Sequence, residues 1–360
     1  MRLSLATVRF VLARLGLVAA GVLVALLLFE VALRLAQPIP EMANPLNSFH
    51  DSDPALGWRG KPSIRMRFHR PDFDALVENG PDGWRRPDPP PPAQPVEKVL
   101  FLGDSFTWGW GVNQGEVFTD ELQRRLPPSI GVYNRGVNAF GTAQEYLLMQ
   151  RELANGHYDK VVVMFFFNDV HNNIDGRHGR RPYFTVANGR LQPANQPAVP
   201  LMSPLTRFLK DHIWTIQLIT SQFNALRDRF EGDESDDAEG AGGPDLDAHT
   251  LAGADETTRL LAAMQQLARE HGAELYVVWV PHRSELEQQP SAMPFIRAVH
   301  TLVAESCRSA GIPFIDLTQP FYDRTRAGAR LIFPHDEHWN ADGHRLAAEA
   351  LLSSPVFASD

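Results

Sequence analysis

The chain has almost no cysteine: Cys307 is the only one in 360 residues. One cysteine excludes an intramolecular disulfide, so the fold must rest on its hydrophobic core. Positively charged residues are also fewer than negatively charged ones, with 34 Lys and Arg and 43 Asp and Glu, which gives a net charge of −9. This balance argues against nucleic acid as a partner. The sequence contains no internal repeat and no Walker-type phosphate loop, and we expect no cofactor.

Charge is absent from the N-terminal run 15–29, and apolar character continues to residue 35. The run is close to the roughly 20 residues that span a bilayer, and it lacks the small-x-small cleavage site of a signal peptide. Three arginines precede it: Arg2, Arg9 and Arg14. Because arginine marks the cytoplasmic side, residues 1–37 predict a single-pass signal anchor in a bacterial inner membrane, with the remainder periplasmic. A cleaved signal peptide is the alternative.

Proline and glycine punctuate residues 38–96, and the stretch 87–95 is rich in proline. Such a stretch is extended and stiff. We expect residues 38–96 to form an extended, irregular linker that packs on the following domain through Trp58 and Trp84.

From residue 97 the hydrophobic pattern alternates between strands and helices. The expected strands are 97–102, 130–134, 160–167, 274–280 and 313–317. The expected helices are about 115–126, 142–155, 292–310 and 341–352. Alternation implies parallel strands with right-handed crossovers in one α/β domain, which we place at 97–358. In such sheets, sites form beyond the carboxyl ends of the strands.

An insertion at about 171–253 interrupts this alternation. Asn188-Gly189 predicts the turn of a β-hairpin. The segment 204–229 has an apolar stripe at helical spacing, which can pack on the domain, form a lid or bind membrane. Residues 231–247 are acidic and rich in glycine, as in a disordered loop.

Two short clusters more than two hundred residues apart contain the chemistry. Gly103-Asp104-Ser105 follows the first predicted strand, and Asp336-Glu337-His338-Trp339 lies near the C-terminus. A serine hydroxyl is a poor nucleophile at neutral pH, and it needs an imidazole within reach and a carboxylate that orients the imidazole. Ser105, His338 and Asp336 supply these three groups.

Two further blocks lie between the clusters. A loop of residues 134–142 follows the second strand, and Asn168-Asp169 ends the third. Each block by itself fits an ordinary turn or cap. In order, however, the four blocks across about 97–352 resemble the SGNH (GDSL-type) hydrolase family. The resemblance implies a flavodoxin-like three-layer sandwich with a central parallel sheet, and it makes Ser105 the nucleophile, His338 the general base and Asp336 the acid.

The resemblance also implies an oxyanion hole with three donors. They are the backbone N–H of Ser105, a backbone N–H of the second block and the side-chain amide of Asn168. The family's glycine in the second block aligns with Ala139, and alanine suits this position if the backbone does not need a positive φ. Gly141 is the alternative donor.

The chain departs from the family pattern in two further places. Phe166 replaces a glycine two residues before the asparagine and is expected to narrow the substrate pocket. Family members often place the acid three residues before the histidine, where this chain has His335, so Asp336 is the better acid. The Asp-x-His-Trp form resembles the catalytic loop of bacterial exopolysaccharide O-acetylation proteins, although those carry their serine after the loop.

Several neighbouring residues have alternative interpretations. His335, Asp336, His338 and His344 include zinc-ligand types, but no partner cluster appears elsewhere, so we expect no metal. Asn340 is expected to cap the last helix, with His344 structural. Trp108 and Trp110 follow the nucleophile closely, and they can stack on sugar rings or pack in the core.

The sequence therefore predicts a serine esterase whose substrate is an acyl ester, principally an O-acetyl ester of envelope or secreted carbohydrate. Three alternatives remain open. One is an acyltransferase of polysaccharide O-acetylation, and another is a lipid esterase or thioesterase. The third is a non-catalytic carbohydrate-binding protein of the envelope that keeps the fold.

Overall fold

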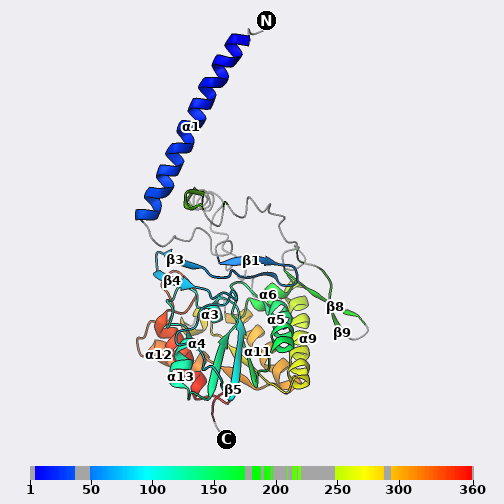
Figure 1. Cartoon of the computed structure of the whole chain (residues 1–360). Helices are drawn as coiled ribbons and strands as arrows, with labels where there is room; N and C mark the ends of the chain where they lie inside the picture. The colour runs from blue at the N-terminus through cyan, green and yellow to red at the C-terminus, as the bar shows by residue number, and fades with distance from the viewer. Residues whose placement is uncertain are drawn as a thin grey trace. The chain divides into compact units, whose positions relative to one another are not determined.

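A computed structural model describes residues 5–36, 49–174, 181–187, 190–195, 197, 209, 213–216, 218–219, 248–287 and 293–358. The chain divides into two compact units, which are drawn in Figure 1. The first unit comprises 1–44 and 201–232, and the second comprises 45–200 and 233–360.

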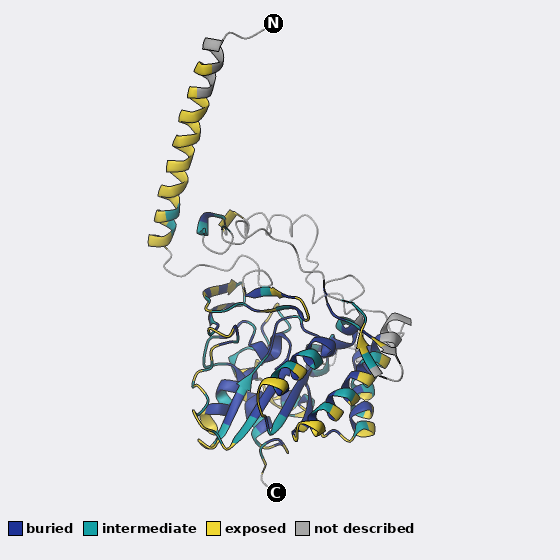
Figure 2. Ribbon diagram, turned by 45° about the vertical axis from the view of Figure 1, so that its right-hand side comes forward, coloured by how far each residue is buried: buried dark blue, intermediate teal, exposed yellow. Residues whose placement is uncertain are grey.

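Helix α1, Leu5–Ala36, is the main element of the first unit. Its section Ala13–Ala36 is long and apolar enough to cross a membrane, with a mean hydropathy of 2.5, and its side chains are mostly exposed (Figure 2). Near its end, Glu30 accepts hydrogen bonds from the backbone N–H groups of Trp214 and Thr215, at 3.0 and 2.8 Å. The predicted apolar helix is present, and it fits a signal anchor and a signal peptide alike.

Five parallel strands form the central sheet of the second unit. They are β5 (Glu97–Gly103), β6 (Ile130–Asn134), β7 (Lys160–Phe165), β10 (Glu274–Trp279) and β11 (Phe314–Asp316). Their spatial order is β11-β10-β7-β5-β6. Numbered by chain position, this is the flavodoxin-like order 2-1-3-4-5, with its switch point between β5 and β7. The predicted α/β fold is confirmed.

The two strands at the switch point are continuous apolar runs. Val99 to Leu102 in β5 and Val161 to Phe165 in β7 are all fully buried. Helices cover both faces of a parallel sheet, so its central strands lack the polar alternation of a half-exposed strand. Figure 2 shows this buried centre between more exposed outer helix faces.

The longer helices form two layers around the sheet (Figure 1). One layer contains α4 (Phe118–Arg125), α12 (Thr318–Arg326) and α13 (Ala341–Leu352). The other contains α5 (Thr142–Asn155), α9 (Ala248–Glu270) and α11 (Met293–Ala310). Short helices follow three strands directly: α3 (Ser105–Trp108), α6 (Asp169–Ile174) and α10 (Arg283–Glu287).

Helix α9 was not expected, although only its first residues lie in the predicted insertion. Its buried side chains Leu260, Met264 and Ala268 recur every four residues, which is the spacing of a helix face packed on a core. The pattern was therefore present in the sequence. Helix α12 and the three short helices were also not expected.

The region expected to be an irregular linker contains two antiparallel hairpins instead. Strand β1 (His50–Asp53) pairs with β2 (Gly57–Gly60), and β3 (Arg65–Arg70) pairs with β4 (Phe73–Glu78). In β3, Met66 and Phe68 are buried between exposed neighbours, the alternation of a strand with one face on a core.

Both tryptophans that were expected to pack this region on the domain do so. The indole N–H of Trp58 donates to the backbone oxygen of Asn138 at 3.0 Å. The guanidinium of Arg135 lies over the ring of Trp84, 4.9 Å from its centroid. The hairpins are therefore part of the folded unit.

The hairpin predicted in the insertion is present. Strand β8 (Phe184–Ala187) pairs antiparallel with β9 (Arg190–Pro193), and Phe184 packs in a cluster with Ala143 and Leu260. The predicted turn Asn188-Gly189 lies outside the described residues. The same is true of most of the predicted helix 204–229 and of all of 231–247.

Candidate active site

The predicted nucleophile lies at the carboxyl end of β5. Asp104 accepts a hydrogen bond from the backbone N–H of Phe106 at 2.9 Å and thereby caps α3. Ser105 is the first residue of this helix. The strand, the cap and the short helix together hold the Ser105 hydroxyl at the edge of the sheet.

The structure brings the two distant sequence clusters into contact. The Nε2 atom of His338 lies 2.6 Å from Oγ of Ser105. On the other side of the ring, Nδ1 lies 2.5 Å from Oδ1 of Asp336. The same oxygen accepts the backbone N–H of His338 at 2.9 Å. Serine, imidazole and carboxylate thus form one continuous chain of hydrogen bonds.

The surroundings of Asp336 favour its charged form. Burial alone would raise its pKa, but the charge and hydrogen bonds of His338 and the indole N–H of Trp110 lower the pKa to about 2. Trp110 donates from Nε1 to Oδ2 at 2.8 Å. Asp336 is therefore a carboxylate throughout the neutral pH range, with both oxygens occupied.

The two blocks expected to supply the oxyanion hole follow strands that pair with β5. Asn168 follows β7, the strand paired with β5. The backbone N–H of Val137 donates to the oxygen of Gly103 at 3.0 Å, which ties the second block to the end of β5. Within the described part of the chain, no hydrogen bond engages the backbone N–H of Ser105 or of Ala139.

Gly141 is the weaker candidate for the second donor, because its N–H already donates to the side-chain oxygen of Gln144 at 3.3 Å. Ala139 has a φ of 59°, in the left-handed region. The condition under which alanine was expected to suit this position, a backbone without a positive φ, is therefore not met. A non-glycine residue in this region costs on the order of 1 kcal/mol, so the loop keeps Ala139 under strain.

Gly136 explains how this loop comes so close to the nucleophile. A Cβ at this position would lie 2.3 Å from the backbone nitrogen of Trp108. Any larger residue would push the second block away from α3.

The neighbouring histidines have roles apart from the triad. The His335 side chain is 82% exposed, and its Nδ1 lies 2.7 Å from Asp72. His344 is buried, and its Nδ1 accepts the backbone N–H of Phe118 at 3.3 Å, as expected of a structural residue. Asn340 caps α13 as predicted. Among the described residues, no group of three His, Cys, Asp or Glu is placed to hold a metal ion.

The three aromatic residues predicted to bind substrate are used mainly in packing. Trp108 is only 2% exposed and packs on Phe49, so of the two roles left open for it, stacking on sugar or packing in the core, the structure shows packing. One face of Trp110 lies against His338, with 5.0 Å between ring centroids. Phe166 is 3% exposed and packs on Phe106, beside the nucleophile. Contact between Phe166 and the substrate stays a prediction.

Three carboxyl groups near the site are buried, and neither this burial nor the presence of Glu145 among them was expected. Asp104 directly follows β5, Glu145 lies in α5 and Asp169 begins α6, and each is at most 1% exposed. Burial, and then the charge of Asp104, raise the pKa of Glu145 well above its ordinary value. Burial, and then the charges of Glu145 and Asp104, raise the pKa of Asp169 well above its ordinary value. Both carboxyls are therefore harder to ionise in the folded protein than in water.

A periodicity argument would have found Glu145. It precedes Leu148 and Met149 by three and four residues, so it lies on the buried face of α5. A carboxyl group on an apolar helix face is unusual enough to mark a special environment.

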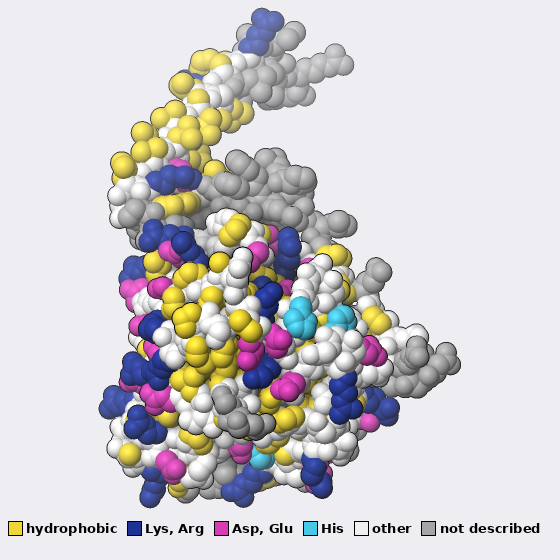
Figure 3. All heavy atoms as spheres, turned by 60° about the horizontal axis from the view of Figure 1, so that its bottom comes forward, with side chains coloured by type: hydrophobic (Ala, Val, Ile, Leu, Met, Phe, Trp, Pro, Cys, Tyr) yellow, Lys and Arg dark blue, Asp and Glu magenta, His cyan; other side chains and the backbone are white. Residues whose placement is uncertain are grey.

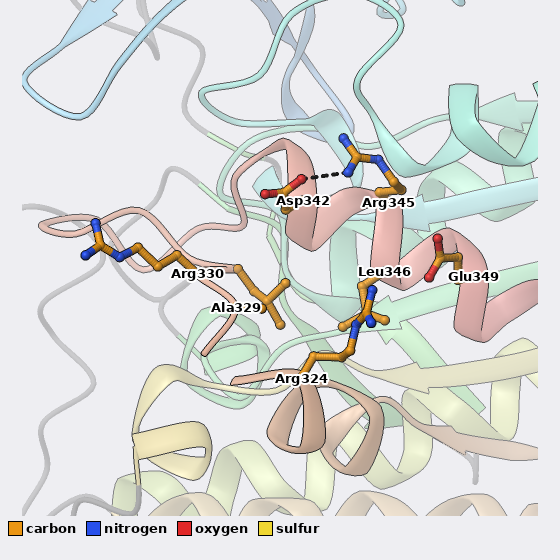
Figure 4. A pocket seen from close by; sticks show the side chains of 8 residues that line it. Arg324, Ala329, Arg330, Asp342, Arg345, Leu346 and Glu349 are labelled. Atoms are coloured by element: carbon orange, nitrogen blue, oxygen red, sulfur yellow. Dashed lines mark hydrogen bonds and ion pairs between the residues drawn. The ribbon is translucent and has the colours of Figure 1, made fainter. Parts of the chain in front are cut away.

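A surface hollow elsewhere on the molecule contains none of these residues. It lies between α12 and α13 (Figure 4), and its lining is Arg324, Ala329, Arg330, Leu331, Asp342, Arg345, Leu346 and Glu349. Arg345 is paired with Asp342 at 2.7 Å. On the face of the molecule drawn in Figure 3, basic and acidic side chains are likewise intermixed. We assign this hollow no part in the reaction.

The raised pKa of Glu145 predicts a specific pH dependence of stability. An acid whose pKa is raised by folding binds its proton more tightly in the folded state than in the unfolded state. Its contribution to the free energy of unfolding is therefore fully present below its unfolded pKa, near 4.5. The free energy of unfolding then falls as the pH rises toward the folded value. We expect Glu145→Gln, which mimics the protonated acid, to reduce this fall as the pH rises above about 4.5.

Denaturant titration at several pH values measures this effect. Glu152→Gln, on the same helix but paired with Arg135, is the control and should keep the wild-type slope. An identical slope for Glu145→Gln and the wild type would contradict the prediction.

Comparisons with known proteins agree with this geometry. Residues 101–346 match the GDSL-like Lipase/Acylhydrolase family. No curated protein matches the chain.

Solved structures with a similar fold include a lipolytic protein of the G-D-S-L family from Veillonella parvula DSM 2008. It is 12% identical, with 73% of this chain and 100% of that chain covered and a TM-score of 0.41. A catalytic variant of the acetylxylan esterase Axe2 from Geobacillus stearothermophilus is 13% identical, with 74% and 99% covered and a TM-score of 0.41. Sequence identities and TM-scores this low do not identify the substrate of the present protein.

The match to the family extends over more than half of the chain. It includes the GDS serine, the second block, the asparagine that follows β7 and the loop that carries Asp336 and His338. The chain belongs to the GDSL-like lipase/acylhydrolase family of ester hydrolases.

Proposed function

We propose that this protein is a membrane-anchored serine esterase that removes acyl groups, principally O-acetyl groups, from carbohydrate of the cell envelope or from a secreted polysaccharide. The observation that carries the proposal is the hydrogen-bond chain from Oγ of Ser105 through His338 to Asp336. Its two short distances join a nucleophile, a base and an acid in the order that acyl transfer needs.

In the first step, Oγ of Ser105 attacks the ester carbonyl while Nε2 of His338 takes the hydroxyl proton. Asp336 holds the ring so that Nε2 faces the serine, and its negative charge stabilises the imidazolium that forms. The lowered pKa of Asp336 keeps that charge in place.

Negative charge then develops on the former carbonyl oxygen. The backbone N–H groups of Ser105 and Ala139 and the side-chain amide of Asn168 are the proposed donors to it. Donors fixed before the reaction stabilise the tetrahedral intermediate without reorganising, and losing one typically costs about 100- to 1000-fold in rate.

His338 returns its proton to the leaving alcohol, and the acyl group remains on Ser105. A water molecule, deprotonated by the same imidazole, releases the acid and restores the serine. If a sugar hydroxyl takes the place of water, the same groups transfer the acyl group instead, so the identity of the acceptor separates esterase from transferase.

Two observations support the choice of substrate. Phe166 packs on Phe106 directly beside the nucleophile, which favours a short acyl group such as acetyl. The apolar helix Ala13–Ala36 supports an enzyme held at the envelope, where O-acetylated polysaccharide is found. An extracytoplasmic position follows from the arginines that precede the helix.

Loss of the serine hydroxyl tests the nucleophile. We expect Ser105→Ala to reduce hydrolysis of short acyl esters by at least about 1000-fold and to leave the fold intact, because catalysis then depends on the oxyanion hole and binding alone. An activated phosphonate should label the wild type at Ser105, located by mass spectrometry, and should not label the variant. Wild-type turnover by Ser105→Ala would exclude Ser105 as the nucleophile.

The assignment of the acid is tested by a pair of adjacent substitutions. We expect Asp336→Asn to lower kcat by roughly 10⁴-fold, because an amide favours the wrong imidazole tautomer. His335→Ala, one residue away, should keep kcat within about tenfold of wild type, because His335 contacts Asp72 and not the triad. Equal losses in the two variants would contradict this assignment.

The topology is tested in spheroplasts of a bacterial host. Added protease should digest the catalytic domain while cytoplasmic markers survive, because the arginine excess keeps the N-terminus in the cytoplasm. Alkaline carbonate should leave the undigested protein in the membrane pellet. A soluble form that begins near residue 37 would show signal cleavage, and a protected domain would reverse the topology.

A further inference from the structure

The triad acid is held by a residue outside the triad. We propose that Trp110 is a positioning residue for Asp336, and that the hairpin β3–β4, which precedes the region matched by the family, keeps Trp110 in place. The inference rests on the proposed roles of Ser105, His338 and Asp336.

Trp110 contacts all three residues of the triad. Its indole N–H donates to Oδ2 of Asp336 at 2.8 Å. Its ring stacks on the imidazole of His338, with 23° between the ring planes. Its backbone N–H donates to the backbone oxygen of Ser105 at 3.0 Å.

The two oxygens of Asp336 have different partners. Oδ1 accepts from Nδ1 and from the backbone N–H of His338. Oδ2 accepts from Trp110. The carboxylate of aspartate rotates easily about its last side-chain bond. The indole therefore fixes the oxygen that His338 does not use and prevents this rotation.

The backbone of the catalytic loop is held separately. Arg283 donates to the backbone oxygens of Phe333 and Asp336, the latter at 2.7 Å. These bonds place the loop but do not reach the carboxylate. The orientation of the carboxylate depends on Trp110 and His338 together.

Hairpin β3–β4 packs behind Trp110. The ring of Phe68 in β3 meets the Trp110 ring edge to face, with 4.8 Å between centroids and 89° between planes. Phe68 also packs on Phe73 in β4, and Phe73 packs on Phe333 of the catalytic loop, at 4.7 and 5.0 Å. Aromatic pairs at these distances each contribute directional packing beyond their buried area.

The turn of the same hairpin binds the catalytic loop. The carboxylate of Asp72 accepts the backbone N–H of His335 at 2.6 Å and lies 2.7 Å from its Nδ1. The hairpin thus contacts the loop at Phe333 and His335, directly before Asp336. Residues 65–78 lie outside the match at 101–346, so the match to the family does not include this support.

The first test replaces the indole by a ring without a donor. Trp110→Phe keeps an aromatic ring against His338 and Phe68 but loses the N–H. Trp84→Phe, at a tryptophan that contacts Arg135 instead, is the matched control for substitution of tryptophan. Both are made in the full chain and assayed in detergent on a short acyl ester.

We expect Trp110→Phe to lower kcat about 10- to 100-fold, the rate equivalent of losing a hydrogen bond to a charged group, with KM within about twofold. Without the indole, the carboxylate holds the imidazolium more strongly, so the acid limb of the pH–rate profile should move to higher pH. Trp84→Phe should change neither quantity. An unchanged kcat and pH profile in Trp110→Phe, or a loss confined to KM, would overturn the role of Trp110.

The second test concerns the hairpin. Asp72→Ala removes the contact with His335, whereas Asp74→Ala removes only the pair with Arg67 in the same hairpin. We expect a several-fold lower kcat for Asp72→Ala and a wild-type value for Asp74→Ala. Because the hairpin acts through the placement of Asp336 and Trp110, the double variant with Trp110→Phe should lose less than the product of the single losses. Equal kcat in the two aspartate variants, or strictly multiplicative losses, would overturn the role of the hairpin.

Phosphonate labelling separates this inference from the proposed function. Trp110→Phe should still label completely at Ser105, only more slowly than wild type, and full-rate labelling would contradict the inference. Absence of labelling in the wild type itself would instead overturn the proposed function, on which the inference rests.

Discussion

The hydrogen bond between Ser105 and His338 is the contact on which the rest of the arrangement depends. It joins residues 233 positions apart, at 2.6 Å. The contact exists because β5 lies inside the sheet, with Ser105 at its carboxyl end, while the loop before α13 returns to the same edge. Parallel strands bring all their carboxyl ends to one edge, so chemistry from distant parts of the chain meets there.

The groups around this contact are individually unfavourable. Ala139 has a positive φ, and Glu145 and Asp169 are carboxyls with no exposed surface. Strain and buried acids persist only where the surrounding structure is rigid enough to hold them. The fully buried runs of β5 and β7 and the close approach of Gly136 to Trp108 provide that rigidity. Core packing next to the site therefore holds the Ala139 loop and the buried carboxyls in place as well as stabilising the fold.

The active region is larger than the part of the chain matched by the family. Trp110 lies inside the match, but Phe68, Asp72 and Phe73, which hold it and the catalytic loop, come earlier in the chain. A family comparison alone does not reveal such support, because it compares only the segments that relatives share. The same hairpin region was expected to be irregular because proline and glycine punctuate residues 38–96, although β3 and β4 are as long as the predicted strands β7 and β10.

The sequence by itself determined the α/β alternation, the bounds of β6, α5 and α13 and the three residue types of the triad, because hydrophobic period and cap residues act locally. The identities of the oxyanion donors remain predictions. Only the tertiary structure decided that Ala139 needs a positive φ, that Trp108 is buried and that Trp110 donates to Asp336. These properties depend on contacts between segments that are far apart in the chain, and the local hydrophobic pattern of the sequence does not specify such contacts.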